Sequence, residues 1–326
     1  MDAVVGLLDG VRARGAFVLR MRMDPPWSLS IRDDAPLTLI CQTHGSAAIV
    51  GESSGTTWLH PGDVALTRGI DHYVFADDPS TAPMAVIHPG QRCTTLTGDT
   101  LEFAMSIGVR TWGNNASGAT RSVICAYEGR SEVSARLLDV LPSVLVLRAD
   151  EWDTPLVDLL GAEAGCEGPG QEAYLDRLLD VLLIAVLRAW FGRDCNAPTW
   201  WHAEQDPVVG PALKLIYNNP EQPWTVANLA AAVGSSRAVF ARRFTELVGE
   251  PPIAFLTGWR LALAADLLQS SGATIAAVAR QVGYSTPFAL SSAFKRAYGV
   301  SPNTHRAASA STGDPVSVEA VGNPLR

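Results

Sequence analysis

The sequence predicts an α+β protein with a β-rich amino-terminal part and an all-helical carboxyl-terminal part. From about residue 37 to 125, short apolar runs are separated by Gly, Pro, Asp and Asn, which is typical of sheet sandwiches and small barrels. After about residue 132, apolar residues recur at helical spacing. A chain of 326 residues is long enough for two domains. We therefore expect a small β-barrel with trailing helices over 1–195, a linker at 196–207, a helical domain at 208–306 and a disordered tail at 307–326.

Three stretches of the first part carry local signals. "HPGD" (60–63) predicts a tight turn before the strand "VALT". The Gly-, Asn- and Ser-rich stretch "WGNNASGATR" (112–121) predicts a mobile loop. "EAYLDRLLDVLLIAVLRAWF" (172–191) has apolar residues around most of a helical circumference, which favours a helix buried on several sides. A dimer contact and ordinary packing within one chain both explain this helix.

The net charge of −8 argues by itself against a nucleic-acid partner, but the charge is unevenly distributed. Residues 208–306 contain nine Lys and Arg against four Asp and Glu, a net charge of +5. The rest of the chain contains 16 basic against 29 acidic residues, a net charge of −13. This division indicates that the helical domain faces phosphate and the remainder does not.

Cysteine usage and hydropathy indicate a cytoplasmic protein without a membrane partner. The amino terminus has no basic segment before its apolar run, as a secretory signal would. The most apolar stretch (178–190) contains Asp180 and Arg188 and is too short to cross a bilayer. The five cysteines are odd in number, scattered and free of CxxC spacing, which predicts reduced thiols without a disulfide or zinc site. They are Cys41, Cys93, Cys125, Cys166 and Cys195.

A helix-turn-helix pattern occurs twice, in "VANLAAAVG" (226–234) and "IAAVARQVG" (275–283). Each copy has Ala at its fifth position, where two crossing helices leave little room, and Gly at its ninth, where the turn needs a positive φ. We expect Thr225 and Thr274 to cap the first helices, and Ser235 and Ser285 to cap the second helices.

The second helix of each unit is the candidate for insertion into the major groove of DNA. Phe240 and Phe244, like Leu290 and Phe294, are spaced i, i+4 and are expected to face the core. Arg242 is the candidate for a bidentate contact to guanine, and Pro287 and Phe288 for apolar contact to a thymine methyl. Phosphate contacts are expected from Arg237, Arg243, Lys295 and Arg296. The complete expected DNA-contact set is Ser235, Ser236, Arg237, Ala238, Ala241, Arg242, Arg243, Ser285, Thr286, Pro287, Phe288, Ser291, Ser292, Lys295 and Arg296.

The two units are joined by a segment (251–271) that predicts one long helix, with Pro251 and Pro252 at its start and Gly272 at its end. A rigid connector of this kind fixes the distance between the two second helices. We expect that distance to be about one turn of the duplex, roughly 34 Å.

Segment 208–306 resembles the DNA-binding domain of the AraC/XylS transcription regulators. The resemblance rests on "WTVANLAAAVGSSRAVFARRFTELVGEPP" and "IAAVARQVGYSTPFALSSAFKRAYGVSPNTHR". It implies a sequence-specific regulator that binds promoter DNA and contacts RNA polymerase. Family members often carry longer polar side chains on the second recognition face, where this chain has Pro287, Phe288 and Ser292.

The first part resembles the cupin-type sensor domain of such regulators, through "PGDVALTRGIDHYVF" (61–75) and "VICAYE" (123–128). The resemblance implies a cupin-like barrel that forms a homodimer and can hold a small-molecule effector, with Trp58, His72 and Tyr73 as candidate contacts. Only His72 stands where a cupin metal ligand is expected, and His44 lacks the partners of the first cupin motif. We therefore predict no metal, no cofactor and no catalytic residues.

Two other functions remain open from the sequence. A cupin-like metal-dependent enzyme with a helical appendage would need a cluster of metal ligands. An interaction module that does not bind DNA would use the acidic part as its working surface.

Overall fold

The computed structural model describes residues 16–51, 55–68, 72–101, 104–127, 141–152, 155–193, 199–270 and 272–312. These residues form two compact units, which divide between His202 and Ala203. Within the described residues, the first unit contains two β-sheets, a 3₁₀ helix, the helices α3 (Leu156–Glu163) and α4 (Gln171–Phe191) and the start of α5 (Thr199–Gln205), and the second is all-helical. The predicted α+β fold class is confirmed.

The larger sheet of the first unit has seven strands and is mostly antiparallel, with β1 parallel to β11. Its strands in spatial order are β10 (Ser106–Gly108), β11 (Thr111–Gly113), β1 (Phe17–Met23), β12 (Thr120–Tyr127), β3 (Leu37–His44), β6 (Val64–Arg68) and β13 (Val144–Leu147). At its centre, Val18 of β1 pairs with Cys125 of β12, which in turn pairs with Leu39 of β3.

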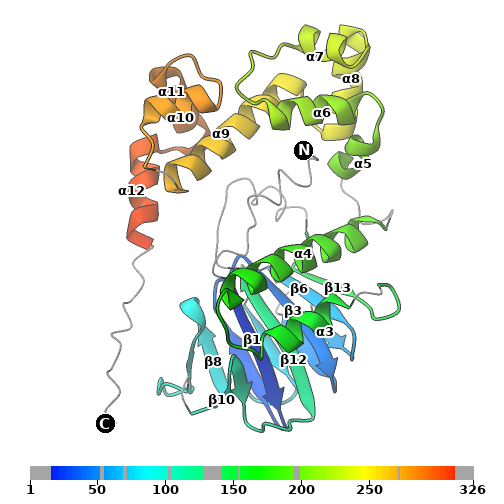
Figure 1. Cartoon of the computed structure of the whole chain (residues 1–326), viewed down its shortest axis with the longest axis vertical. Helices are drawn as coiled ribbons and strands as arrows, with labels where there is room; N and C mark the ends of the chain where they lie inside the picture. The colour runs from blue at the N-terminus through cyan, green and yellow to red at the C-terminus, as the bar shows by residue number, and fades with distance from the viewer. Residues whose placement is uncertain are drawn as a thin grey trace. The chain divides into compact units, whose positions relative to one another are not determined.

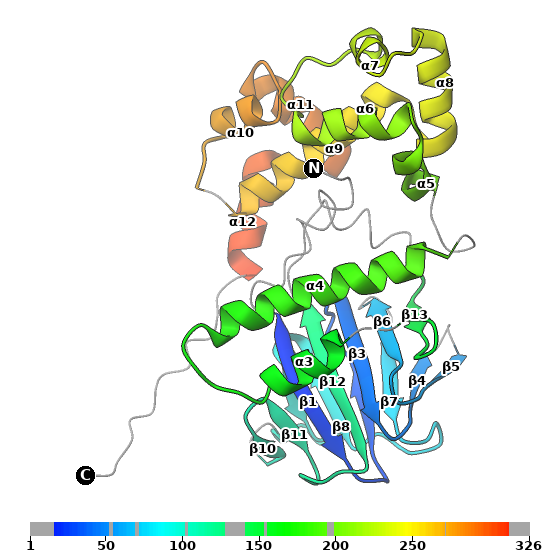
Figure 2. The same ribbon diagram turned by 45° about the vertical axis from the view of Figure 1, so that its right-hand side comes forward.

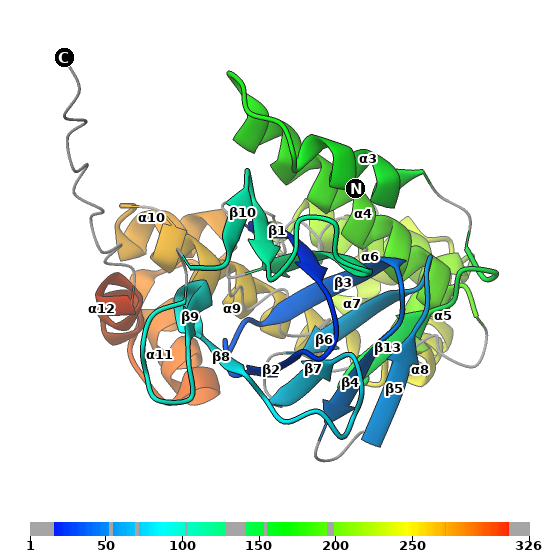
Figure 3. The same ribbon diagram turned by 90° about the horizontal axis from the view of Figure 1, so that it is seen from below.

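The smaller sheet has six strands, and its labelled strands can be distinguished from those of the larger sheet in Figure 3. Its order is β5 (Gly55–Leu59), β4 (Ala47–Gly51), β7 (Tyr73–Ala76), β2 (Ser28–Ile31), β8 (Ala85–His88) and β9 (Arg92–Thr94), with the 3₁₀ helix η1 (Pro89–Gln91) between β8 and β9. The expected cupin-like barrel is present as two sheets that, over the residues described, do not close into one barrel. A barrel needs an unbroken ladder, and in the described ranges none joins the edge strands of one sheet to those of the other.

The larger sheet is buried on both faces. Alternate residues of β3 show this directly: Leu39 and Cys41 belong to the cluster beneath the helices, whereas Ile40 belongs to the cluster between the sheets. The helices are α3 (Leu156–Glu163) and α4 (Gln171–Phe191), and α4 crosses the outer face of the sheet in Figure 2. The buried Tyr127 hydroxyl donates to the Leu179 carbonyl at 3.0 Å, which fixes α4 on the sheet.

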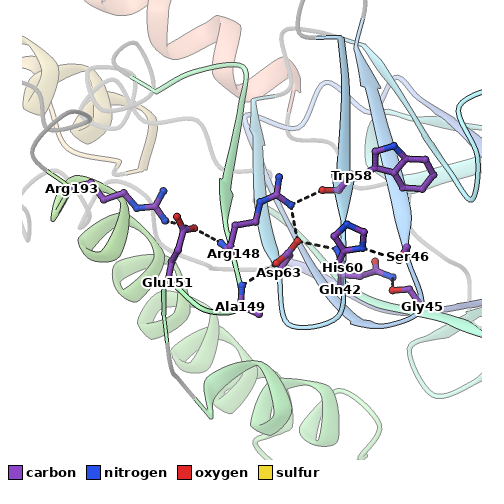
Figure 4. A network of polar contacts seen from close by, with 10 residues as sticks. All are labelled: Gln42, Gly45, Ser46, Trp58, His60, Asp63, Arg148, Ala149, Glu151 and Arg193. Atoms are coloured by element: carbon purple, nitrogen blue, oxygen red, sulfur yellow. Dashed lines mark hydrogen bonds and ion pairs between the residues drawn. The ribbon is translucent and has the colours of Figure 1, made fainter.

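A buried carboxylate closes the "HPGD" turn, as Figure 4 shows. Asp63 is 3% exposed and accepts hydrogen bonds from the amides of His60 at 2.9 Å and Ala149 at 3.0 Å. Arg148 forms an ion pair with the same carboxylate at 2.8 Å. Glu151 then links the Arg148 amide to the Arg193 side chain, just after α4. The predicted turn is confirmed, and it is part of a network that reaches the end of α4.

A segment expected as a mobile loop and a segment expected as a linker both contain defined contacts or elements. The loop within 112–121 is fixed by Asp24, whose carboxylate accepts from the Ala119 amide at 2.8 Å and whose carbonyl accepts from the Asn114 side chain at 2.8 Å. The expected linker at 196–207 contains helix α5 (Thr199–Gln205). Trp201 packs its ring 5.0 Å from that of Phe191, an apolar anchor that a plain linker lacks.

The second unit places two helix pairs at the two ends of α9 (Figure 1). Its helices are α6 (Val209–Asn218), α7 (Val226–Ala232), α8 (Arg237–Val248), α9 (Pro252–Ser270), α10 (Ile275–Gln281), α11 (Pro287–Tyr298) and α12 (Pro302–Thr312). The predicted connector is confirmed as α9, which is about 28 Å long at 1.5 Å per residue. Helix α12 continues six residues past the boundary expected at 306, and 313–326 lie outside the described residues.

The second unit has an apolar core at each end of α9. At one end, Tyr217 packs on Trp259 with ring centroids 4.6 Å apart, and Phe244 packs on Phe255 at 5.7 Å. At the other end the core contains Leu261, Leu268, Val278, Val282, Leu290 and Phe294. In the described ranges, no helix is both long and apolar enough to span a bilayer.

Candidate nucleic-acid interface and ligand cavity

Both turns of the repeated motif have the geometry that the sequence predicts. Gly234 and Gly283 adopt φ values of +67° and +82°, which favour glycine. Ala230 and Ala279 are each 1% exposed, so both small side chains are buried where the helices cross, as predicted. The two helix-turn-helix units are therefore α7–α8 and α10–α11, and we call α8 and α11 the recognition helices.

The capping residues are partly as expected. Thr225 and Thr274 accept hydrogen bonds from backbone amides at 3.1 and 3.2 Å and cap α7 and α10, as predicted. The predicted caps Ser235 and Ser285 were wrong, since each recognition helix begins one residue later.

The actual caps are Ser236, which accepts from the Val239 amide at 3.4 Å, and Thr286, which accepts from the Ala289 amide at 3.1 Å. Each turn is closed by the residue that follows its Gly. The Ser235 amide donates to the Ala230 carbonyl at 2.9 Å, and the Tyr284 amide donates to the Ala279 carbonyl at 2.8 Å. The cap follows Gly234 by two residues but Gly283 by three, so the second turn is one residue longer.

The rotation of each recognition helix is fixed by its buried side chains. Phe240, Phe244, Leu290 and Phe294 are each 0% exposed, which confirms the predicted core faces. The opposite faces consist of residues from the expected DNA-contact set. Those that are exposed are Ser236, Arg237, Ala238, Arg242, Arg243, Ser285, Thr286, Pro287, Phe288, Ser292, Lys295 and Arg296, and Ser235, Ala241 and Ser291 are half-buried.

Arg243, a member of the expected DNA-contact set, already forms an ion pair within the helical unit. The Arg243 guanidinium donates two hydrogen bonds to the Asp206 carboxylate, with a Nε–Oδ2 distance of 2.8 Å. The other Asp206 oxygen accepts from the amides of Val208 and Val209, both at 2.9 Å, at the start of α6. Arg243 therefore joins α8 to α6 and is less available to DNA than its neighbours.

The ionisation of this pair follows from its geometry. Burial disfavours the charged Asp206 carboxylate, but the Arg243 side chain and the two amides outweigh it and lower the pKa of Asp206. The hydrogen bonds and charge of Asp206 in turn raise the pKa of Arg243. Sequence reasoning missed Asp206, although an Asp just before a helix is a recognised cap signal.

The remaining cations of the recognition helices are open to solvent. Arg242 is 72% exposed and forms a 3.7 Å ion pair with Glu246, which is 59% exposed. Such a pair contributes little and can exchange for phosphate or a base edge. Arg237 lies at the start of α8, and Lys295 and Arg296 lie in the last turn of α11.

Arg260 fixes the loop before α7 through hydrogen bonds to backbone carbonyls. Its Nε donates to the Pro220 carbonyl at 2.6 Å and its Nη2 to the Gln222 carbonyl at 2.7 Å. Gly283 approaches the same loop so closely that an added Cβ would lie 2.8 Å from the Glu221 backbone. The turn between α10 and α11 is thus packed against the loop that precedes α7, within the helical unit.

The first unit encloses a cavity of about 240 Å³ between its two sheets. Of the three candidate effector contacts, Tyr73 lines it. Tyr73 is buried, which raises the pKa of its hydroxyl, and that hydroxyl accepts a hydrogen bond from Thr67 at 3.4 Å. Trp58 lies on the outward face of the edge strand β5, and the exposed His72 pairs with Asp34 at 3.3 Å, so neither lines the cavity.

The cavity wall is mainly apolar, with aliphatic and aromatic side chains from both sheets that include Leu19, Met21, Leu29, Ile40, Phe75 and Trp112. Polar and charged residues also line it, namely Asp33, Thr38, Tyr73, Gln91, Ser106, Arg110 and Thr111. The Asp33 carboxylate accepts from Gln91 at 3.1 Å, and Arg110 donates to the Cys166 carbonyl at 3.1 Å. Nowhere in the described ranges do three His, Cys, Asp or Glu residues form a group that could hold a metal ion.

Four of the five cysteines lie within the described residues. Cys41, Cys93 and Cys125 are buried and Cys166 is exposed, whereas Cys195 lies outside those residues. Burial raises the pKa of Cys41 to about 12 and that of Cys125 well above its ordinary value. These two thiols are therefore protonated and unreactive at neutral pH.

Comparison with known proteins divides the chain in the same way. A family described as cupin matches residues 2–192, and a family described as helix-turn-helix domain matches residues 229–308. An AraC-like transcription regulator of Streptomyces lividans is 36% identical over 52% of this chain and 58% of its own length. The chain thus spans little more than half of that relative.

A second relative aligns from end to end. The transcriptional regulator AlkR of Acinetobacter baylyi is 28% identical over 94% of this chain and 99% of its own length. Among solved structures, the DNA-binding domain of AdpA, a global transcriptional factor in complex with a target DNA, is 34% identical. That match has a TM-score of 0.32 and covers 33% of this chain and 96% of the AdpA chain.

Proposed function

This chain belongs to the AraC-like helix-turn-helix transcription regulators that carry an amino-terminal cupin domain, and from this premise we propose that it binds promoter DNA and regulates transcription. The observation that supports the proposal is the pair of helix-turn-helix units joined by one helix, each with an exposed recognition face. The units differ in sequence, so each is suited to a different segment of one duplex. Since the target is promoter DNA, we place its action in the cytoplasm and its regulatory contact on RNA polymerase.

Within the interface we assign base contacts to Arg242 of α8 and to the first turn of α11, and phosphate contacts to the other exposed cations of the two helices. Arg242 offers a planar pair of donors for the O6 and N7 atoms of guanine. Arg237, Lys295 and Arg296 can neutralise phosphates. Arg243, in contrast, would have to leave Asp206 in order to contact DNA.

The decisive experiment compares Arg242→Ala with Arg177→Ala in the full chain. The two arginines are 72% and 70% exposed and form ion pairs of similar length, 3.7 and 3.6 Å, but Arg177 lies on α4. The probe is the duplex that the wild-type chain selects from a randomised pool. We expect Arg242→Ala to weaken binding to this duplex by about 1–3 kcal/mol, because a bidentate base contact is lost. Fluorescence anisotropy measures this. Equal affinities for the two variants would refute the role assigned to Arg242.

We further propose that the protein acts as a homodimer through α4. Tyr174 and Val181 lie two turns apart on this helix and are 44% and 48% exposed, so the helix keeps an apolar stripe outside its own core. With Leu178 and Ala185, the spacing of 4, 3 and 4 residues is that of a helix-pairing seam. Val181→Glu should shift the full chain toward monomer in sedimentation velocity at micromolar concentration. An unchanged dimer would place the contact elsewhere.

The cavity between the sheets is the proposed effector site, and Tyr73 remains its candidate contact. Its mainly apolar wall suits a small molecule with an apolar body, and lining residues such as Asp33, Tyr73 and Arg110 can hydrogen-bond the polar groups that such a molecule carries. An effector that binds one arrangement of the dimer better than another shifts the population competent for DNA binding.

A further inference from the structure

Phe288 is the most solvent-exposed large apolar side chain among the residues that the structure describes. It is 81% exposed, whereas the others of this kind with high exposure range from 36% to 66%. A single exposed apolar residue is common on protein surfaces and needs no explanation by itself. The position of Phe288, as the second residue of a recognition helix, makes this one informative.

The direction of the Phe288 side chain is fixed by the rest of α11. At 100° per residue, Phe288 lies about 160° around the helix from Leu290, which is fully buried. Phe294 is fully buried one turn further along, so the helix cannot rotate to hide Phe288. Thr286 caps the helix and Pro287 occupies its first position, which sets the backbone of this turn.

The surroundings of Phe288 permit close approach but offer no charge. Ser291 and Ser292, three and four residues further along, are small. No residue from 284 to 294 is charged, and the cations of α11 lie in its last turn. The equivalent position of α8 is Ala238, between Arg237 and the exposed Arg242. The two recognition helices thus present different chemistry, charged in α8 and apolar in the first turn of α11.

We propose that Phe288 is the specificity-determining residue of α11 and recognises the C5-methyl group of a thymine in the major groove. This inference rests on the DNA binding proposed above. The thymine methyl is the one apolar group that base edges present in the major groove. Contact between the ring and the methyl removes apolar surface of both from water, so affinity gains at a thymine and at no other natural base.

The test removes the methyl and leaves the base pairing unchanged. The probe is the duplex that the full-length wild-type chain selects from a randomised pool, with each thymine replaced singly by deoxyuridine. For the wild type, we expect one or two of these replacements to weaken binding about three- to tenfold, as measured by fluorescence anisotropy. Phe288→Ala should bind the thymine duplex with this weakened affinity and lose sensitivity to the same replacements.

Val239→Ala is the matched control, since Val239 is a 46% exposed apolar residue in the first turn of α8. It should retain the deoxyuridine sensitivity that Phe288→Ala loses, and thermal unfolding should show both variants folded. If Phe288→Ala keeps that sensitivity, the inference is wrong and DNA binding stands. If Phe288→Ala lowers transcription in vitro at unchanged DNA affinity, Phe288 contacts a protein instead. If the wild type retains no duplex at any salt concentration, the proposed function and this inference both fail.

Discussion

Gly234 and Gly283 occupy the same place in the two helix-turn-helix units and have the same left-handed backbone, but their surroundings differ. A Cβ on Gly234 would meet no heavy atom within 4 Å. A Cβ on Gly283 would lie 2.7 Å from the Arg260 guanidinium and 2.8 Å from the Glu221 backbone. Side-chain ends can move aside, whereas backbone atoms cannot do so cheaply. The requirement for glycine is therefore conformational at 234 and both conformational and steric at 283.

This difference predicts that a Gly→Ala substitution lowers the free energy of unfolding more at position 283 than at position 234. Gly234→Ala should lower the free energy of unfolding by about 1 kcal/mol, the cost of a left-handed alanine. Gly283→Ala should cost about 3 kcal/mol, because overpacking against the loop at Glu221 is added to the same backbone cost. Urea denaturation of the full chain measures both values. Equal costs would mean that the loop yields without resistance and that the close approach is unimportant.

The contact that Asp206 makes between α6 and α8 makes the stability of α6 depend on pH. Asp206 holds the first turn of α6 and the Arg243 side chain of α8 at once. Its pKa is lowered in the folded chain. The ionised carboxylate therefore stabilises the fold above the unfolded-state pKa of about 3.9, and this stabilisation is lost as the pH falls through the lower folded value.

Asp206→Asn removes that titration while keeping the shape of the side chain. We expect the variant to be less stable than the wild type at pH 7, and the difference in urea midpoint to shrink as the pH falls below about 4. Asp99→Asn is a suitable control, because that residue is a surface carboxylate of the sheet unit, bonded only within its own turn. A difference that stays constant down to pH 2 would show that the charge of Asp206 is not what stabilises α6.

The elements also show what the sequence could and could not predict. The helix-turn-helix units were predictable because their signals are local: a small residue, a glycine and an apolar pair at fixed spacing. The caps were misplaced by one residue because several neighbouring Ser and Thr side chains can each accept the first amide, and only the turn geometry selects among them. The open sheets could not be distinguished from a barrel, because closure depends on pairing between distant strands.

The candidate cavity was the least predictable part. Tyr73 and His72 are adjacent in sequence, but only Tyr73 belongs to β7 and lines the cavity, and the side of the sheet that faces inward is set by strands far away in the chain. Arg243 likewise resembled a DNA contact as closely as Arg242 did. Only the folded unit shows that Asp206, 37 residues away, engages one and not the other.

At the scale of the whole molecule, the separation of charge should dominate the energetics of DNA binding. The chain has a net charge of −8, yet the helical segment 208–306 carries the excess of cations. Four exposed cations of the recognition helices can reach phosphates or base edges: Arg237, Arg242, Lys295 and Arg296. Because each neutralised phosphate contributes about −0.9 to the slope of log K against log salt, a slope of at least about −3 per chain is expected.

Removing two of these cations tests the separation directly. Arg237→Ala combined with Lys295→Ala should make the slope of log K against log salt less steep by about 2, with affinity lost nearly equally for all sequences, because phosphate contacts carry no sequence information. The control pair Arg92→Ala and Arg177→Ala removes the same charge from exposed positions of the sheet unit and should leave the slope unchanged. If both pairs reduce the slope alike, DNA responds to the net charge of the chain, and the recognition helices are not its phosphate-binding surface.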